Sequence, residues 1–190
     1  MPLNIPNLLT WLRILLIPVF ATVFYLPETW LQPQWVNLTA TLIFAVAAVT
    51  DWLDGYLARV LNQTSAFGAF LDPVADKLMV AAALVILVEL GRVDAPIALV
   101  IVGREITISA LREWMAGIGQ GRSVAVSFIG KLKTTAQMVA ILLLLYHDPV
   151  LGLFNAQVWG TWLIYIAAIL TLWSMGYYLK KALPMVIEGD

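Results

Sequence analysis

Cysteine is absent from this 190-residue chain, and histidine occurs once. Without cysteine the protein has no disulfide, no thiolate nucleophile and no zinc site of the cysteine type. The single histidine, His147, stands beside Asp148 and Pro149 in a predicted loop, so we assign it no catalytic role. Charged residues are also scarce, at 12% of the chain against about 25% in soluble domains. This composition argues against an ordinary soluble enzyme.

Hydrophobic residues make up 62% of the chain, and the mean hydropathy is +0.89. A membrane-spanning helix needs about 20 mostly apolar residues. The sequence predicts six such helices, separated by short breaks that contain proline, glycine, asparagine or glutamine. They run over residues 7–26, 36–60, 69–90, 95–116, 123–146 and 157–181. We therefore predict an all-α integral membrane bundle of six transmembrane helices, forming a single domain over residues 1–190.

The distribution of basic residues predicts how this bundle is oriented. The loops after the first and fifth predicted helices contain no lysine or arginine, and the loop after the third contains only Arg92. The basic residues predicted at the opposite side are Arg13, Arg59, Lys77, Arg112, Arg122, Lys131, Lys133, Lys180 and Lys181. Because cytoplasmic loops carry the excess of lysine and arginine, this side should be cytoplasmic, with both termini inside.

Four aspartates lie at the cytoplasmic ends of the second and third predicted helices. Asp51 and Asp54 are three residues apart and Asp72 and Asp76 four apart, so each pair shares one helix face. The connector between the helices is short, which makes them antiparallel neighbours and lets the four carboxylates converge. Each carboxylate costs roughly 2.5–3.5 kcal/mol at a membrane helix centre. An oxygen-ligated divalent cation, Mg²⁺ or Mn²⁺, would compensate them in a polar cavity open to the cytoplasm.

The alternative to a metal site is a set of interhelical ion pairs. Asp51 or Asp76 would then pair with Arg59 or Lys77, but the four acids outnumber the nearby bases. Pro73, directly after Asp72, suits the first turn of the third helix and could aim that carboxylate.

Small residues accompany the aspartates. Gly55, Ala58 and Gly68 would leave room for a ligand above the metal site, although small residues are also common where membrane helices pack together. Arg59 would face a phosphate at the membrane surface, with snorkelling to the interface as its alternative explanation.

These residues together form a recognisable motif. Asp-x-x-Asp-Gly-x-x-Ala-Arg, followed by Gly-x-x-x-Asp-x-x-x-Asp, occupies the stretch from Asp51 to Asp76. This motif resembles the signature of the CDP-alcohol phosphotransferases at every defining position. Residues 6–13 look like the first helix of that family. Residues 104–114 and 130–137 resemble its bacterial branch that uses sn-glycerol 3-phosphate as acceptor.

The resemblance implies a six-helix fold, usually dimeric, that transfers a phosphatidyl group from CDP-diacylglycerol to an alcohol and releases CMP. It assigns Asp51, Asp54 and Asp72 to divalent metal, and Asp76 to the general base, also near the metals. The residues expected to bind the nucleotide or donor are Thr10, Asp54, Gly55, Ala58, Arg59 and Gly68. We expect a homodimer in the bacterial cytoplasmic (inner) membrane, in contact with membrane lipid and with no nucleic-acid partner.

An acceptor that brings its own phosphate needs further cations. Arg104 and Arg112 are eight residues apart, so one broad helix face can hold both; Glu105 and Arg112 align more closely and could pair. Lys131 and Lys133 point in different directions, so we expect only one of them to enter the pocket. Snorkelling to lipid headgroups would also explain Arg112 and both lysines, but Arg104 lies too deep for it.

Several alternatives to a phosphatidyl transfer to glycerol 3-phosphate stay open. Another branch of the family would use serine, inositol phosphate or phosphatidylglycerol. A divalent-metal transporter would carry polar residues through both halves of the bundle, whereas the predicted outer half is almost wholly apolar. A prenyl-diphosphate transferase also uses aspartate-bound Mg²⁺ but lacks the Gly-x-x-Ala-Arg arrangement, and a purely structural membrane protein would not need four clustered acids.

Overall fold

The computed structural model describes residues 5–60, 66–119, 128–150 and 154–187. These residues form six helices and one minimal strand pair, which confirms the all-α prediction. The helices are α1 (Ile5–Val23), α2 (Pro33–Val60), α3 (Ala66–Glu89), α4 (Ala95–Gly117), α5 (Phe128–Tyr146) and α6 (Ala156–Ile187). The strands β1 (Pro149–Val150) and β2 (Phe154–Asn155) pair antiparallel in the connection before α6.

Several helix boundaries differ from the sequence prediction, among them the end of α1, which lies at Val23 rather than at residue 26. Helix α2 begins at Pro33 rather than at residue 36, because proline is favoured in a first helical turn. Helix α3 begins at Ala66, so Pro73 lies inside it and the prediction of a first-turn position was wrong. Helix α6 continues to Ile187, six residues beyond the predicted end at residue 181. The predicted start of the fifth helix at residue 123 lies outside the described residues.

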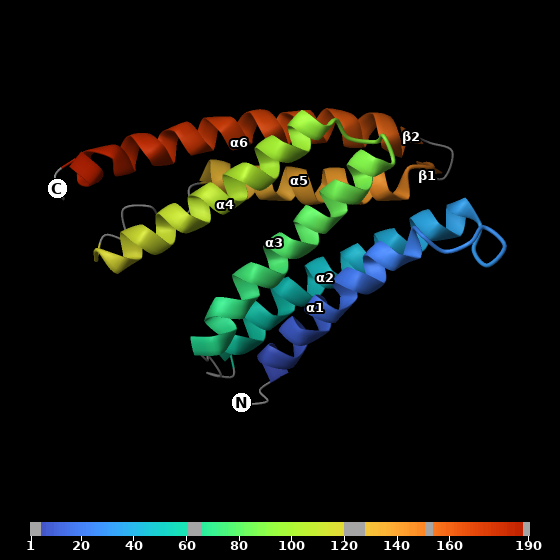
Figure 1. The fold of residues 1–190 in the computed structure, drawn as a ribbon, viewed down its shortest axis with the longest axis horizontal. Helices are drawn as coiled ribbons and strands as arrows, with labels where there is room; N and C mark the ends of the chain where they lie inside the picture. The colour runs from blue at the N-terminus through green and yellow to red at the C-terminus, as the bar shows by residue number, and fades with distance from the viewer. Residues whose placement is uncertain (1–4, 61–65, 120–127, 151–153, 188–190) are drawn as a thin grey trace.

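The helices form two groups that diverge from one another (Figure 1). Helices α1, α2 and α3 pack together, and α6 packs against both α5 and α4. Contacts of α2 with α5 and of α3 with α4 join the groups. Figure 1 shows the connections after α1, α3 and α5 toward one end, and both chain termini toward the other. The groups spread apart toward the end with the termini, where the sequence predicts the polar cavity.

Two helices are long and apolar enough to cross a membrane by length and composition, over Pro33–Asp54 and Ala156–Lys180. Shorter apolar stretches cover Leu8–Val23 and Leu132–Tyr146. Large side chains such as Trp173, 71% exposed, point away from the bundle. An outward apolar surface of this kind suits lipid rather than water. The described residues thus contain two candidate membrane spans, and the bundle of six spans stays a prediction.

A hydrophobic core joins all six helices on the side away from the diverging ends. Its fully buried members include Phe20, Phe44, Leu84 and Ile101, with Ile164 contributed by α6. A second, small cluster of Ile108, Met115 and Tyr178 lies between α4 and α6, nearer their diverging ends. The apolar core leaves the polar residues of α2, α3 and α4 to gather on one side of it.

One arginine ties three elements together at the end opposite the termini. Nη1 of Arg92 donates to the backbone carbonyls of Leu144 and Leu145, both at 3.0 Å, and Nη2 donates to Asn37 Oδ1 at 2.8 Å. These bonds satisfy carbonyls at the C-terminal end of α5, which have no partner within the helix. Burial lowers the pKa of the Arg92 guanidinium below its ordinary value, and the nearby Asp148 partly offsets this effect.

We expect Arg92→Met to lower the free energy of unfolding by about 3 kcal/mol, because hydrogen bonds to a charged group contribute roughly 1.5–3 kcal/mol each. The measurement is thermal unfolding of the purified protein in detergent. Arg92→Lys keeps the charge but cannot donate through two parallel N–H groups. Its melting temperature should therefore lie between those of Arg92→Met and the wild type. An unchanged melting temperature for Arg92→Met would show that these bonds do not fasten α5.

Candidate active site

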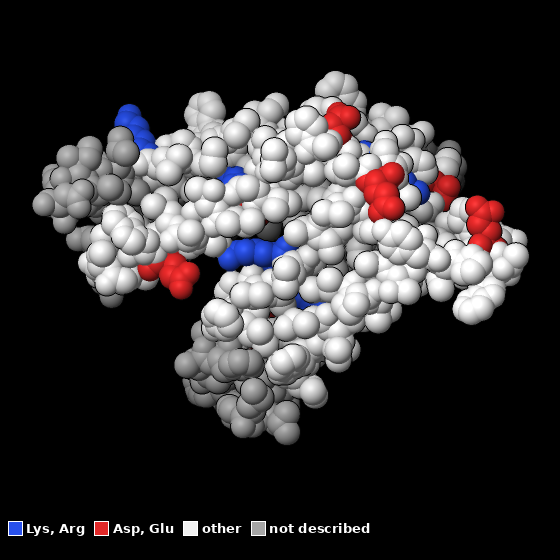
Figure 2. Space-filling view, in the orientation of Figure 1, with Lys and Arg blue, Asp and Glu red and all other residues white. Residues whose placement is uncertain are grey.

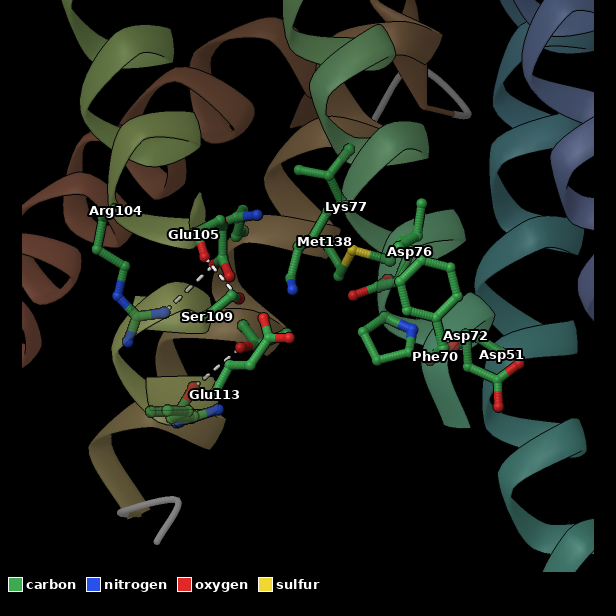
Figure 3. Close-up of a pocket in the computed structure, with 17 residues that line it drawn as sticks. Asp51, Phe70, Asp72, Asp76, Lys77, Arg104, Glu105, Ser109, Glu113 and Met138 are labelled. Carbon is green, nitrogen blue, oxygen red and sulfur yellow. Dashed lines mark hydrogen bonds and ion pairs between the residues drawn. The ribbon is translucent and has the colours of Figure 1, made fainter. Parts of the chain in front are cut away.

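A cavity of about 860 Å³ lies between α3 and α4, with α2 and α5 contributing to its walls (Figure 3). In Figure 2 the molecule is hollowed between its two helix groups, and a basic side chain lies across the hollow. Ionisable and polar side chains line much of the cavity: Asp51, Asp72, Asp76, Lys77, Arg104, Glu105, Ser109, Arg112, Glu113, Thr134 and Gln137. A polar cavity of this size can hold a ligand such as a nucleotide or a small phosphorylated alcohol.

Carboxylates form one wall of the cavity. Asp51 comes from α2, and Asp72 and Asp76 come from α3 one helical turn apart. In Figure 3 these three residues lie on the same side of the cavity, across from α4. Asp54 is buried behind this wall, with only 3% of its side chain exposed. Three of the four predicted carboxylates thus line one cavity, and the fourth, Asp54, is not among its lining residues.

Residues of α1 hold the carboxylates in place. Nη1 of Arg13 donates to Asp51 Oδ1 at 2.7 Å, and Nη2 of the same guanidinium pairs with Asp54 Oδ2. The hydroxyl of Thr10 donates to Asp72 Oδ1 at 2.5 Å. Arg13 is 1% exposed, so its charge is compensated by these carboxylates rather than by water. Thr10 and Arg13 are three residues apart, which places both on the face of α1 that meets α2 and α3.

The ion pairs differ from those predicted as the alternative to a metal site. The sequence pointed to Arg59 or Lys77 as partners of Asp51 or Asp76, and the partner found for Asp51 is Arg13. Sequence spacing could not predict this pair, because Arg13 and Asp51 are 38 positions apart in the chain. Only the packing of α1 against α2 brings them into contact. Lys77 instead points into the cavity between its two walls (Figure 3). The side chain of Arg59 lies outside the described part of the chain.

Helix α4 forms the opposite wall, which we call the basic wall for Arg104 and Arg112, and which also carries Glu105 and Glu113. Arg104 is 7% exposed, which agrees with the depth expected for it. Nη2 of Arg104 donates to Ser174 Oγ at 3.0 Å, and Nη1 lies 3.5 Å from Glu105 Oε1. Glu105 also pairs with Lys133 of α5. The predicted pairing of Glu105 with Arg112 was wrong, because α5 presents a lysine to the same carboxylate.

Of the two lysines of α5, only Lys133 has a described side chain, so the expectation that a single lysine enters the pocket stays a prediction. Lys133 is fully buried, and among the described residues it reaches the cavity only through Glu105, which lines it. The side chain of Lys131 lies outside the described residues, as do those of Gly55 and Ala58. Gly68 is described and is buried in the first turn of α3. The structure thus leaves the predicted small-residue nucleotide site as a prediction.

Sequence analysis missed several lining residues. Gly130, Thr134 and Gln137 of α5 line the cavity and are spaced by four and three residues, so they share one helix face. Their spacing, within the segment 130–137 that resembles the family, could have identified them as lining residues. Gln137 is buried, and its Oε1 has no hydrogen-bond partner among the residues described. Ser109 and Glu113, one turn apart on α4, also line the cavity and were not predicted.

The donor set of the acidic wall suits a hard divalent cation, because carboxylate oxygens are the ligands that Mg²⁺ and Mn²⁺ prefer. The positions of these side chains do not form a ready metal site. In the described ranges no three histidine, aspartate or glutamate side chains are grouped closely enough to hold an ion. Arg13 supplies the positive charge between Asp51 and Asp54 instead. The residues fit a metal by chemistry, and Arg13 would have to share its carboxylates with it.

Comparison with known proteins agrees with this site. The sequence profile described as CDP-alcohol phosphatidyltransferase matches residues 3–173. Proteins of Escherichia coli strain K12, Shigella flexneri serotype 5b and Shigella sonnei are each 55% identical to the chain over 185 residues, covering 96% of both sequences. Each carries the name CDP-diacylglycerol–glycerol-3-phosphate 3-phosphatidyltransferase. With its acidic and basic walls in one cavity and this match over most of its length, the chain belongs to the CDP-alcohol phosphatidyltransferase family.

Proposed function

We propose that the protein transfers the phosphatidyl group of CDP-diacylglycerol to sn-glycerol 3-phosphate, giving phosphatidylglycerol phosphate and CMP. The observation that carries this proposal is the cavity with carboxylates on one wall and arginines on the other. Such a cavity can hold a pyrophosphate donor beside an acceptor that brings its own phosphate. The proposal also agrees with the names of relatives that match 96% of the chain.

The acidic wall is the proposed donor side. Asp51, Asp54, Asp72 and Asp76 would hold Mg²⁺ or Mn²⁺, which when bound neutralises charge on the pyrophosphate as CMP leaves. Thr10 holds Asp72 by a hydrogen bond, so we assign it to donor positioning. We propose that Gly55, Ala58, Arg59 and Gly68 contact the nucleotide, as the resemblance implies.

Asp76 is the proposed general base. It lies half-buried on the cavity wall, facing the arginines of α4 across the space where an acceptor would bind. As the acceptor hydroxyl oxygen bonds to the phosphorus of the phosphatidyl group, its proton passes to Asp76. The bond from that phosphorus to the oxygen of CMP breaks, and CMP leaves with the electron pair.

The basic wall is the proposed acceptor side. Arg104 and Arg112 line the cavity, and guanidinium groups bind phosphate oxygens through paired hydrogen bonds. Lys133 would act indirectly by holding Glu105, whereas Lys131 stays a proposed direct contact. A free serine acceptor would leave these cations without a ligand, which favours an acceptor with a phosphate of its own.

We further propose a homodimer in the bacterial inner membrane with six spans, both termini in the cytoplasm and the cavity facing it. The basic residues at the end with the termini support this orientation. It also suits the chemistry, because the acyl chains of the donor stay in lipid while its cytidine stays in water.

The test is CMP release from CDP-diacylglycerol by purified protein in mixed micelles with Mg²⁺, offering glycerol 3-phosphate, glycerol, serine and inositol phosphate separately. We expect turnover with glycerol 3-phosphate and rates at least about a hundredfold lower with glycerol, because the phosphate contacts would be lost. Turnover with a different acceptor would keep the roles of the aspartates but overturn the assignment of Arg104 and Arg112. Folded protein that releases no CMP with any acceptor would refute the proposed function and revive the metal transporter.

A further inference from the structure

Helix α6 places two buried polar side chains directly against the basic wall. We propose that Ser174 and Tyr178 of α6 are positioning residues that orient Arg104 and Arg112, and so set the affinity for the phosphate of the acceptor. This inference rests on the proposed function. It concerns residues beyond the matched family segment, which ends at residue 173. Both side chains are nearly inaccessible, at 2% and 0% exposed.

Ser174 is arranged as a hydrogen-bond acceptor for Arg104. Its hydroxyl donates to the carbonyl of Thr171 in the preceding turn of α6 at 2.9 Å. A serine hydroxyl has one hydrogen, so its oxygen is left to accept. The Nη2 group of Arg104 donates to that oxygen at 3.0 Å. The serine therefore holds one edge of the guanidinium in a fixed direction.

Tyr178 contacts both arginines. The guanidinium carbon of Arg112 lies 5.3 Å from the centre of the Tyr178 ring, and that of Arg104 lies 6.0 Å from it. Nη2 of Arg112 also lies 3.4 Å from the tyrosine hydroxyl. These distances are within the range over which a cation is attracted to an aromatic face. The ring is held in turn by Ile108 and Met115 of α4, with which it forms the small buried cluster.

The Tyr178 ring brings the two arginines of the basic wall toward the same side of α4. Arg104 and Arg112 are separated by eight residues, or about 80° around a helix, and their like charges repel one another. A common aromatic surface draws both toward one side of α4, and both line the cavity. The Nε atom of each arginine is buried and has no hydrogen-bond partner among the described residues.

The experiment compares Michaelis constants for the two substrates in Tyr178→Leu, Tyr178→Phe and Ser174→Ala. For Tyr178→Leu we expect the KM for glycerol 3-phosphate to rise roughly tenfold, the size of change expected from losing cation–π contacts to partly desolvated guanidiniums. The KM for CDP-diacylglycerol should change by less than about twofold, because the donor binds the opposite wall. Tyr178→Phe keeps the ring and should restore the acceptor KM to within about threefold of wild type.

Ser174→Ala is the milder probe, since it removes one hydrogen bond without opening a large cavity. We expect its acceptor KM to rise about three- to tenfold. In an Arg112→Met background, Tyr178→Leu should raise the acceptor KM by clearly less than it does in the wild type, because one of its two contacts is already gone. Tyr177→Phe is the matched control: Tyr177 is the adjacent residue, 46% exposed, and should leave both KM values unchanged.

The outcomes separate this inference from the proposed function. Wild-type turnover with glycerol 3-phosphate, together with an acceptor KM unchanged in Tyr178→Leu and Ser174→Ala, would overturn the positioning role alone. Equal rises in both KM values would also overturn it, because they would indicate a general loss of packing. If Tyr178→Leu does not fold, the acceptor KM of Ser174→Ala decides the matter. No turnover by the wild type would refute the proposed function itself.

Discussion

Asp76→Asn should lower the rate of CMP release by about a hundredfold to ten-thousandfold, the range supplied by a positioned general base. The amide is nearly the same size as the carboxylate but cannot take the proton of the acceptor hydroxyl. The carboxylate of Asp76 lies half-buried on the cavity wall, so the loss should appear in kcat at saturating substrates. The measurement is CMP release with glycerol 3-phosphate, together with thermal unfolding to confirm that the variant is folded.

The matched control for this prediction is Glu28→Gln, which also neutralises one carboxylate. Glu28 is exposed in the connection after α1 and is not among the residues that line the cavity. It should keep wild-type activity, which would separate the loss of a base from a loss of negative charge in general. An Asp76→Asn variant with more than about a tenth of wild-type kcat would assign the base to another group.

Arg13→Met should destabilise the protein by about 3–5 kcal/mol, the usual result of removing one partner from a buried ion pair. Arg13 is 1% exposed and is bonded to both Asp51 and Asp54, so its loss leaves two carboxylates without their countercharge. The measurement is thermal unfolding in detergent with divalent ions removed. The double variant Arg13→Met, Asp54→Asn should recover part of the lost stability, because it also removes a stranded charge.

The same variant gives a test of metal binding that does not depend on activity. If the carboxylates bind Mg²⁺ or Mn²⁺ as proposed, added ion should raise the melting temperature of Arg13→Met more than that of the wild type, because the guanidinium no longer competes. Arg13→Lys keeps one positive charge, so added ion should raise its melting temperature less than that of Arg13→Met. Equal shifts in all three proteins would mean that Arg13 and the ion do not share these carboxylates.

Much of the architecture followed from local pattern. Helix α4 was expected over residues 95–116 and runs over Ala95–Gly117, because a proline near its start and glycines at its end bound one apolar segment. The spacing of Asp72 and Asp76 predicted a shared helix face, and both line the cavity. Two minimal strands in a break expected to be irregular were not predictable, since a ladder of two residues on each side has no sequence period to detect.

The sequence by itself determined the all-helical fold, the family and the face on which each aspartate lies, because periodicity along one helix and a motif are both local properties. Only the tertiary structure decided which residue faces which. It placed Arg13 between Asp51 and Asp54, chose Lys133 as the partner of Glu105, and brought Tyr178 under both arginines. Those choices depend on how α1, α5 and α6 pack against the signature helices, and helix packing joins residues that no spacing along the chain relates.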